Sequence, residues 1–210
     1  YKAGADYIID DMNELLDVID DINRKLDQNA ARKLLTPGPL TTRHSVKYAM
    51  LTDHCTWDDD YKMITTSVID DITHISADDD YTTILLQGSG SYAVEAMINS
   101  LCGKNEKILF LVNGEYGKRM LTIANDSGKD YEHLMFDMTQ PIDTDEVEKK
   151  LQKDKDIAVV ILVHCETTTG IINPLEELTK LAKTYGKKVF VDAMSSFAAY
   201  DIDMPGLDID

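Results

Sequence analysis

The chain has 210 residues, of which 43% are hydrophobic and 28% charged, and its formal net charge is −17 at pH 7. This length is enough for one α/β domain with a packed core and a short additional segment. The acidity argues against nucleic acid or an anionic membrane surface as a partner, and an anionic substrate would need a locally basic pocket. No stretch has the pattern of a membrane span or a signal peptide, so we expect a cytoplasmic protein.

The cysteines Cys55, Cys102 and Cys165 are odd in number and far apart, so we expect no disulfide framework. His54 and His164 directly precede two of them. These pairs lack the spacing of a zinc knuckle or of ligands on a helix, so we expect no metal site.

The beginning of the chain predicts a strand followed by a helix. Residues 5–9 form a short apolar run, and the apolar residues of the following segment recur at helical spacing. Residues 27–32 are polar without a period and predict a linker. We therefore divide the chain into a strand–helix tail, residues 1–32, and a domain, residues 33–210. A dimerisation helix is the simpler interpretation of the tail.

After the linker, Thr36, Pro37 and Gly38 begin a rigid, turn-rich segment, because proline fixes φ and glycine permits a close backbone approach. A short helical stretch follows, and then a polar run at residues 53–61 that contains the only tryptophan, Trp57. This run is a candidate binding loop, and the alternative is a surface turn anchored by the indole ring.

Apolar strand-like runs then alternate with helical segments. The predicted strands cover residues 81–86, 107–112, 131–136, 157–163 and 188–192. Strands that alternate with helices at this spacing are joined by right-handed crossovers. The predicted fold class is therefore α/β, a mostly parallel sheet with flanking helices. Asn173 is expected to cap the helix after the fourth strand, with Pro174 in its first position.

Polar residues gather at the carboxyl ends of these strands, the edge at which parallel sheets bind ligands. Residues 88–91, Gly-Ser-Gly-Ser, lead from a strand into a helix. Free N–H groups and hydroxyls at such a helix start favour an anion such as phosphate, and an ordinary turn is the alternative. The run lacks the third glycine of the dinucleotide fingerprint and the lysine of a P-loop.

Asp192 ends the last predicted strand. A carboxylate in an apolar crevice needs a cationic partner or good donors, and a protonated pyridine nitrogen would be such a partner. Tyr116 could stack on a ring and Thr167 could meet a phenolic oxygen. Each has an ordinary alternative: Asp192 and Thr167 as turn caps, and Tyr116 as a core residue. Together with a phosphate site they describe pyridoxal 5′-phosphate, an electron sink for carbanions formed next to an amine.

Several runs carry a resemblance to a known family. They are Leu35-Thr36-Pro37-Gly38-Pro39-Leu40, Cys55-Thr56-Trp57-Asp58, Gln87-Gly88-Ser89-Gly90-Ser91, Asn113-Gly114-Glu115-Tyr116-Gly117, His164-Cys165-Glu166-Thr167-Thr168-Thr169-Gly170 and Val191-Asp192-Ala193-Met194-Ser195-Ser196. Through them residues 33–210 closely resemble the 2-aminoethylphosphonate–pyruvate transaminases, which are class V, fold-type-I aminotransferases. The resemblance implies transfer of the amino group of 2-aminoethylphosphonate to pyruvate, giving phosphonoacetaldehyde and L-alanine, by a pyridoxal-phosphate-dependent homodimer of phosphonate catabolism.

The resemblance also implies which residues form the site. The implied cofactor-binding residues are Ser89, Gly90, Ser91, Tyr116, Thr167, Asp192 and Met194. The first three would hold the phosphate, the tyrosine and methionine would pack on the two faces of the ring, the threonine would hydrogen-bond the ring oxygen, and the aspartate would pair with the pyridine nitrogen. Thr36, Pro37, Gly38 and Trp57 would shape the substrate pocket at a subunit boundary.

The family forms a Schiff base through a lysine that follows the aspartate, whereas this sequence ends at Asp210. Lys187 and Lys188 precede Asp192 on the same strand, roughly 15 Å from its carboxyl end. We therefore expect the chain to be a fragment with a partial large domain, without a catalytic residue and inactive alone.

The tail carries a second resemblance. Gly4-Ala5-Asp6-Tyr7 and Asp20-Asp21-Ile22-Asn23 resemble the C-terminal end of phosphonoacetaldehyde hydrolase, a haloacid dehalogenase family. That family consumes the aldehyde that the transaminases produce, so residues 1–32 would be the tail of an upstream domain in a bifunctional protein.

Other functions stay open at this point. Within the aminotransferases, the chain could be an alanine–glyoxylate or serine–pyruvate aminotransferase, or a cysteine desulfurase. Outside that class, it could be chiefly a phosphonate hydrolase, although no nucleophilic aspartate or magnesium site can be identified. A non-catalytic binding module is the third possibility, and it would leave the spectrum of pyridoxal phosphate unchanged.

Overall fold

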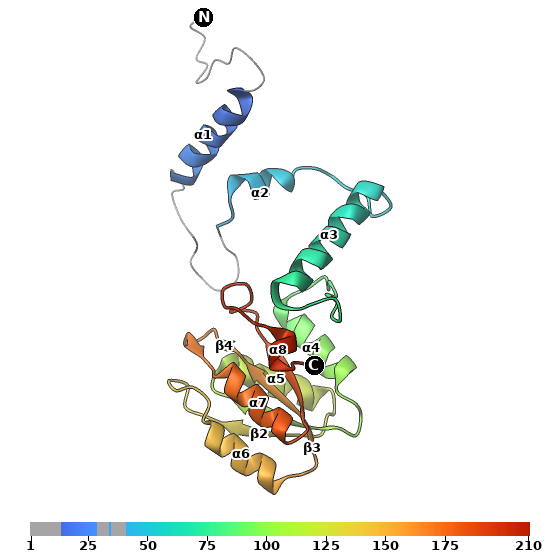
Figure 1. The fold of residues 1–210 in the computed structure, drawn as a ribbon, viewed down its shortest axis with the longest axis vertical. Coiled ribbons are helices and arrows are strands. Elements are labelled where there is room, and N and C mark those ends of the chain that lie inside the picture. Colours follow the sequence, from blue (N-terminus) through green and yellow to red (C-terminus); the bar gives the residue numbers. More distant parts are fainter. Residues whose placement is uncertain (1–13, 29–33, 35–40) are drawn as a thin grey trace, which may run out of the picture. The chain divides into compact units, whose positions relative to one another are not determined.

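The computed structural model describes residues 14–28, 34 and 41–210 (Figure 1). The chain divides into two compact units, residues 1–62 and residues 63–210. The predicted strand at residues 5–9 lies outside the described residues, as does the predicted boundary after residue 32. Among the described residues, no helix is long and apolar enough to cross a membrane.

The first unit contains helices α1 (Glu14–Gln28) and α2 (His44–Ala49), which confirm the two helical stretches predicted there. Helix α1 includes the first two residues of the predicted linker, because Asp27 and Gln28 extend its last turn. Helix α3 (Asp59–Ser76) begins in this unit and continues into the second.

The second unit is built on a four-stranded parallel sheet in the order β2-β1-β3-β6. Its elements are α4 (Gly90–Leu101), β1 (Lys107–Val112), α5 (Glu115–Asp126), β2 (Tyr131–Met135), α6 (Thr144–Lys153), β3 (Ile157–Val163), α7 (Leu175–Thr184), β6 (Lys188–Asp192) and α8 (Met204–Leu207). A short antiparallel pair, β4 (Cys165–Glu166) and β5 (Ile171–Ile172), follows β3. The predicted α/β class is confirmed.

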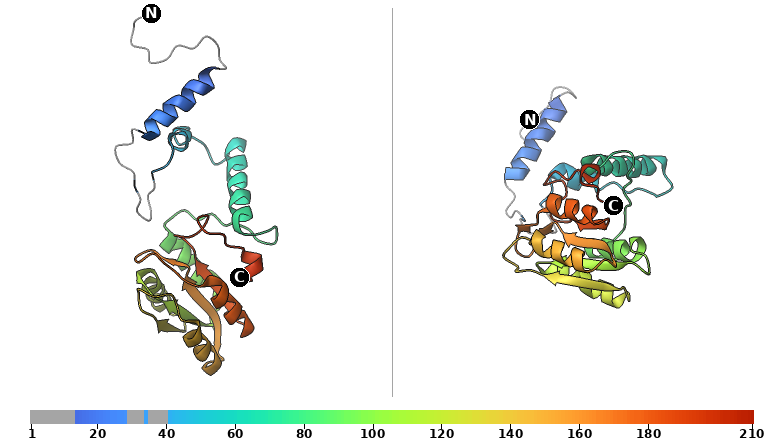
Figure 2. Two further views of the ribbon diagram at one scale, coloured as in Figure 1. Left: turned by 60° about the vertical axis from the view of Figure 1, so that its left-hand side comes forward. Right: turned by 60° about the horizontal axis from the view of Figure 1, so that its bottom comes forward.

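Alternate residues of the strands point to opposite faces of the sheet, and each face is covered by helices (Figure 2). On β1, Leu109 and Leu111 pack with residues of α6 and α7. Ile108, Phe110 and Val112 pack with residues of α4 and α5. Burial on both faces explains why the strands are continuous apolar runs, and it contributes roughly 25 cal/mol for each Å² of apolar surface removed from water.

The register brings the carboxyl ends of the strands to one edge of the sheet. Val112 pairs with Met135, and Val163 pairs with Asp192. Loops that follow β1, β3 and β6 therefore leave the sheet side by side. This is the edge at which the sequence predicts a ligand site.

Two predicted features are wrong in the structure. Residues 81–86 form no strand, because no strand in the described part of the chain pairs with them, and Ile84 is 76% exposed. Asn173 does not cap α7, whose N-cap is Pro174. The Asn173 side chain instead turns into the interior, where its amide donates to the backbone oxygen of Val163 at 2.8 Å.

Candidate functional site

The predicted anion site lies at the start of α4. Ser89 is the N-cap of this helix, and its hydroxyl accepts a hydrogen bond from the backbone N–H of Tyr92 at 3.4 Å. The first N–H groups of a helix have no intrahelical acceptor and, with the helix dipole, favour an anion. Gly90 leaves room for Met194, since a β-carbon there would lie 3.1 Å from the Met194 sulfur.

Tyr116 lies in the first turn of α5, and a buried carboxylate fixes that turn. Glu166 is fully buried and accepts from the backbone N–H groups of Tyr116 at 3.3 Å and Gly117 at 3.4 Å. It also accepts from the Thr168 hydroxyl at 2.7 Å. A carboxylate at a helix N-terminus is stabilised by the helix dipole and by these donors. Glu166 therefore sets the position of the Tyr116 ring relative to the loop after β3.

Thr167 and Asp192 lie on neighbouring segments of the same edge. The Thr167 hydroxyl forms a short hydrogen bond with the Ser195 hydroxyl. The Asp192 carboxylate accepts from the backbone N–H of Met194 at 3.0 Å. The first contact ties the loop after β3 to the loop after β6, and the second holds the start of the loop after β6.

Burial raises the pKa of Asp192, the negative charge of Glu166 raises it further, and the Met194 N–H partly offsets both effects. In the part of the chain that the structure describes, no cation contacts this carboxylate. A half-buried carboxylate with a raised pKa at a ligand-binding edge is suited to pairing with a protonated ligand nitrogen.

The contacts between these segments form a closed circuit, defined here as the site ring. Its residues, in order, are Ser91, Arg119, Tyr116, Glu166, Thr167, Ser195, Met194 and Gly90. Each residue in this order either contacts the next one or is adjacent to it in the sequence. The circuit closes because Gly90 directly precedes Ser91 in the sequence. All seven predicted cofactor-binding residues belong to this ring or contact it directly, so the sheet edge brings them together.

Sequence reasoning missed Arg119 and Glu166. Glu166 stands inside a quoted motif, between Cys165 and Thr167, but an acidic residue that caps a helix from another segment has no local signature. Arg119 lies one turn after Tyr116 on α5, and this spacing, which places two side chains on one helix face, is the signal that could have found it.

The site ring belongs wholly to the second unit, whereas the predicted substrate residues come from the part of the chain before residue 63. Thr36, Pro37 and Gly38 lie outside the described residues. Trp57 belongs to the first unit and is 83% exposed.

Lys187 and Lys188 lie at the other edge of the sheet. Lys187 Nζ donates to the backbone oxygen of Lys155, which precedes β3, at 3.1 Å. Lys188 Nζ donates to the Glu106 carboxylate, which precedes β1, at 2.7 Å. Both amines therefore lie at the amino end of the strands, away from Asp192.

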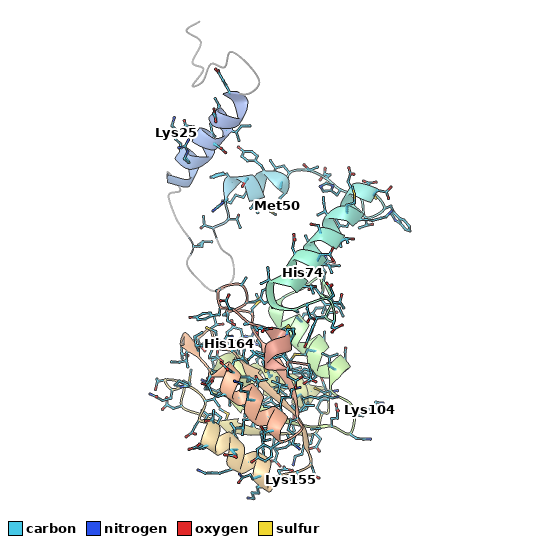
Figure 3. All side chains as sticks on the ribbon, viewed as in Figure 1. Lys25, Met50, His74, Lys104, Lys155 and His164 are labelled. Atoms are coloured by element: carbon cyan, nitrogen blue, oxygen red, sulfur yellow. The ribbon has the colours of Figure 1, made fainter. Side chains whose placement is uncertain are left out.

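Buried polar side chains next to the site ring hold the carboxyl ends of the strands together. Asn113 and Asn173 exchange amide hydrogen bonds of 2.8 and 3.1 Å. His164, labelled in Figure 3, follows β3. Its ring packs edge-on against Tyr200 with 5.9 Å between the ring centroids. Its backbone N–H donates to the Asp192 backbone oxygen at 2.9 Å. Burial lowers the pKa of His164.

The site offers a helix N-terminus with hydroxyls for a phosphate, an aromatic ring for stacking and a carboxylate for a cationic nitrogen. Pyridoxal 5′-phosphate has a phosphate, a flat ring and a basic ring nitrogen, so the residues present fit this cofactor. The fit is tested most directly at Asp192, because its carboxylate lacks a cationic partner among the described residues.

Comparison with known proteins agrees with this chemistry. The profile of the family described as aminotransferase class-V matches residues 67–210. A 2-aminoethylphosphonate–pyruvate transaminase of Bacteroides fragilis strain YCH46 is 49% identical over 180 residues, which cover 84% of this chain and 50% of the relative. A Bacillus cereus protein of the same name is 48% identical over 179 residues, covering 84% of this chain and 52% of the relative. The chain thus spans about half the length of the curated relatives that it matches.

Solved structures share the fold. An alanine–glyoxylate aminotransferase from Nostoc sp. superimposes with a TM-score of 0.79 at 26% identity, over 85% of this chain and 48% of its own. A pyridoxamine–pyruvate aminotransferase from Mesorhizobium loti superimposes with a TM-score of 0.78 at 24% identity, over 87% and 47%. Enzymes of this class depend on pyridoxal phosphate. The family match and the identity to curated relatives agree, and this chain belongs to the class-V aminotransferases.

Proposed function

We propose that this chain is part of a 2-aminoethylphosphonate–pyruvate transaminase, which converts 2-aminoethylphosphonate and pyruvate to phosphonoacetaldehyde and L-alanine. The observation that carries the proposal is the identity of 49% over 180 residues to a relative of that name. The whole reaction is proposed for the complete gene product, because the relatives are about twice as long as the matched region.

The proposed role of the site ring is to bind and orient pyridoxal phosphate. Ser89, Gly90 and Ser91 would hold its phosphate at the start of α4, where N–H groups and hydroxyls converge. Tyr116 and Met194 would contact the two faces of the pyridine ring of the cofactor. When bound, the cofactor supplies an electron sink for a carbanion formed next to the amino group.

Two side chains would then control protons and orientation. Asp192 would hold a proton on the ring nitrogen, since a nearby carboxylate favours the charged form of a base. The Thr167 hydroxyl would donate to the ring oxygen, and Ser195, its neighbour in the structure, would keep the hydroxyl in place. Both contacts orient the ring with respect to the sheet edge.

The alternative substrates are those of other class-V aminotransferases. An alanine–glyoxylate aminotransferase of the same fold is only 26% identical, against 49% for the phosphonate enzyme. This difference favours 2-aminoethylphosphonate as the amino donor. The proposed homodimer and the proposed cytoplasmic location rest on the family resemblance alone.

For residues 1–32 we keep the proposal of a tail from a phosphonoacetaldehyde hydrolase-like domain. Helix α1 agrees with the helix that this resemblance requires. The test is hydrolysis of phosphonoacetaldehyde to acetaldehyde and phosphate by the complete gene product. If no phosphate is released, the proposal of a hydrolase-like domain is contradicted, and residues 1–32 are only an additional helical segment.

The test of the transaminase proposal is an absorbance spectrum of the complete gene product loaded with pyridoxal phosphate. We expect 2-aminoethylphosphonate without pyruvate to convert the bound cofactor to its amine form, and pyruvate to restore the first spectrum. Serine and alanine serve as matched amine controls. A response to another donor but not to 2-aminoethylphosphonate would contradict the substrate and leave the cofactor.

A further inference from the structure

Arg119 and Tyr116 share one face of α5. They are three residues apart, so their side chains lie one above the other on the helix surface. The Arg119 guanidinium carbon lies 5.0 Å from the centroid of the Tyr116 ring. At this distance a cation is attracted to the face of an aromatic ring. The guanidinium therefore lies beside the ring proposed to stack on the cofactor.

The same guanidinium reaches the anion site at the start of α4. Arg119 Nη1 donates a hydrogen bond of 2.8 Å to the Ser91 hydroxyl. A hydroxyl that accepts from a guanidinium keeps its own proton available for another acceptor, and its polarised O–H becomes a better donor. Ser91 is thereby prepared to donate to an anion.

The negative charge around the site makes the contact between Arg119 and Ser91 important for binding an anion. Asp192 and Glu166 are acidic, and the chain has a net charge of −17. A phosphate would add further negative charge, which the partial charge of one helix N-terminus offsets only in part. Within the described residues, Arg119 is the cationic member of the site ring, whereas the neighbouring Lys118 is paired with Glu115 at 2.6 Å.

We propose that Arg119 is a further binding residue of this site, which neutralises the phosphate of the cofactor and orients the Ser91 hydroxyl toward it. The inference rests on the proposed function, because it requires a phosphate at the start of α4. Arginine suits this task, since its planar group can face Tyr116, donate to Ser91 and still present further N–H donors to an anion.

The test compares two ligands that differ only in the phosphate. The cofactor-free complete gene product is titrated with pyridoxal phosphate and with pyridoxal, and both dissociation constants are measured by absorbance. We expect Arg119→Gln to weaken the binding of pyridoxal phosphate by roughly 10- to 100-fold and to change the dissociation constant of pyridoxal by no more than about twofold. Arg119→Lys should fall between, because it keeps the charge but loses the planar donor group.

Lys118→Gln is the matched control, because it makes the same change of charge on the adjacent residue of α5. It should leave both dissociation constants unchanged. If Arg119→Gln weakens the binding of both ligands equally, the inference is overturned and Arg119 serves only to position the Tyr116 ring. If the variant weakens the binding of neither ligand, the inference is also overturned. If the unmodified protein binds no pyridoxal phosphate, the proposed function itself fails, which is a different result.

Discussion

Glu166 packs against the backbone of Gly114 and occupies the space that a β-carbon at this glycine would need. The close approach lets the carboxylate reach the N–H groups of Tyr116 and Gly117 in the first turn of α5. The glycine is required here by space and not by its backbone angles, because its φ of −174° is extended. One glycine in the loop after β1 therefore allows one acid from the loop after β3 to hold the start of α5.

We expect Gly114→Ala to lower the free energy of unfolding by about 1–3 kcal/mol, because the added methyl group overpacks a buried contact. In Glu166→Ala the space is open, so the double variant should lose less stability than the sum of the two single variants. Urea unfolding measures all three. Gly103→Ala is the control, since its β-carbon would meet only the end of the flexible Glu106 side chain, at 3.2 Å. Strictly additive losses would contradict the contact.

Asp192 should make the cofactor-free protein less stable than its amide variant at neutral pH. Burial raises the native pKa of Asp192 above the ordinary value of 3.8. Between pH 3.8 and the native pKa, the native state therefore binds more protons than the unfolded state. Stability therefore falls as pH rises from 3.8 through the native pKa. We expect Asp192→Asn to raise the urea midpoint at pH 7, with a gain that disappears near pH 3.8.

The same variant should bind pyridoxal phosphate roughly 10- to 100-fold more weakly, because it loses a charge-assisted hydrogen bond. For the urea midpoint at pH 7, Asp137→Asn is a control with the opposite expected change. The Thr139 hydroxyl and N–H lower the pKa of Asp137 and so stabilise its ionised form, which this variant loses. Unchanged affinity in Asp192→Asn would contradict the proposed pairing with the ring nitrogen.

His164 should contribute to loss of stability in acid. Its Nδ1 is buried without a hydrogen-bond partner among the described residues, and burial lowers its pKa below 6.5. The unfolded state then binds more protons than the native state, so stability falls as pH decreases from 6.5 through the native pKa. We expect His164→Phe to lose less stability than the unmodified protein between pH 7 and pH 5. Equal losses in His164→Phe and the unmodified protein would contradict this role of His164.

The sequence predicted the parts of the fold that depend on local pattern. Strands β1, β3 and β6 are apolar runs buried on both faces, and the parallel arrangement that follows brings Tyr116, Thr167 and Asp192 to one edge. Residues 81–86 have the same apolar pattern but no pairing strand in the described region, and pairing is not a local property.

Contacts between distant segments could not be predicted in this way. Arg119 is 28 residues from Ser91, and Glu166 is 50 residues from Tyr116. Arg119 lies within a helix, away from the strand ends. Glu166 follows β3 next to Thr167, but nothing in its local sequence indicates that its partner is the start of α5. The cofactor roles of the site residues stay predictions. The substrate-binding roles of Thr36, Pro37 and Gly38 also stay predictions, because these residues lie outside the described part of the chain.

Asn173 should be essential for the stability of the site edge, because one buried amide satisfies several groups. Its Oδ1 accepts from the Asn113 amide at 2.8 Å and from the Ile142 N–H at 3.1 Å, while its Nδ2 donates to the Val163 backbone oxygen at 2.8 Å. Asn173→Ala leaves these partners buried and unpaired, so we expect a loss of about 2–4 kcal/mol in urea unfolding. Exposed Asn125→Ala should lose less than about 0.5 kcal/mol. Equal effects would mean that water replaces the buried amide without a penalty.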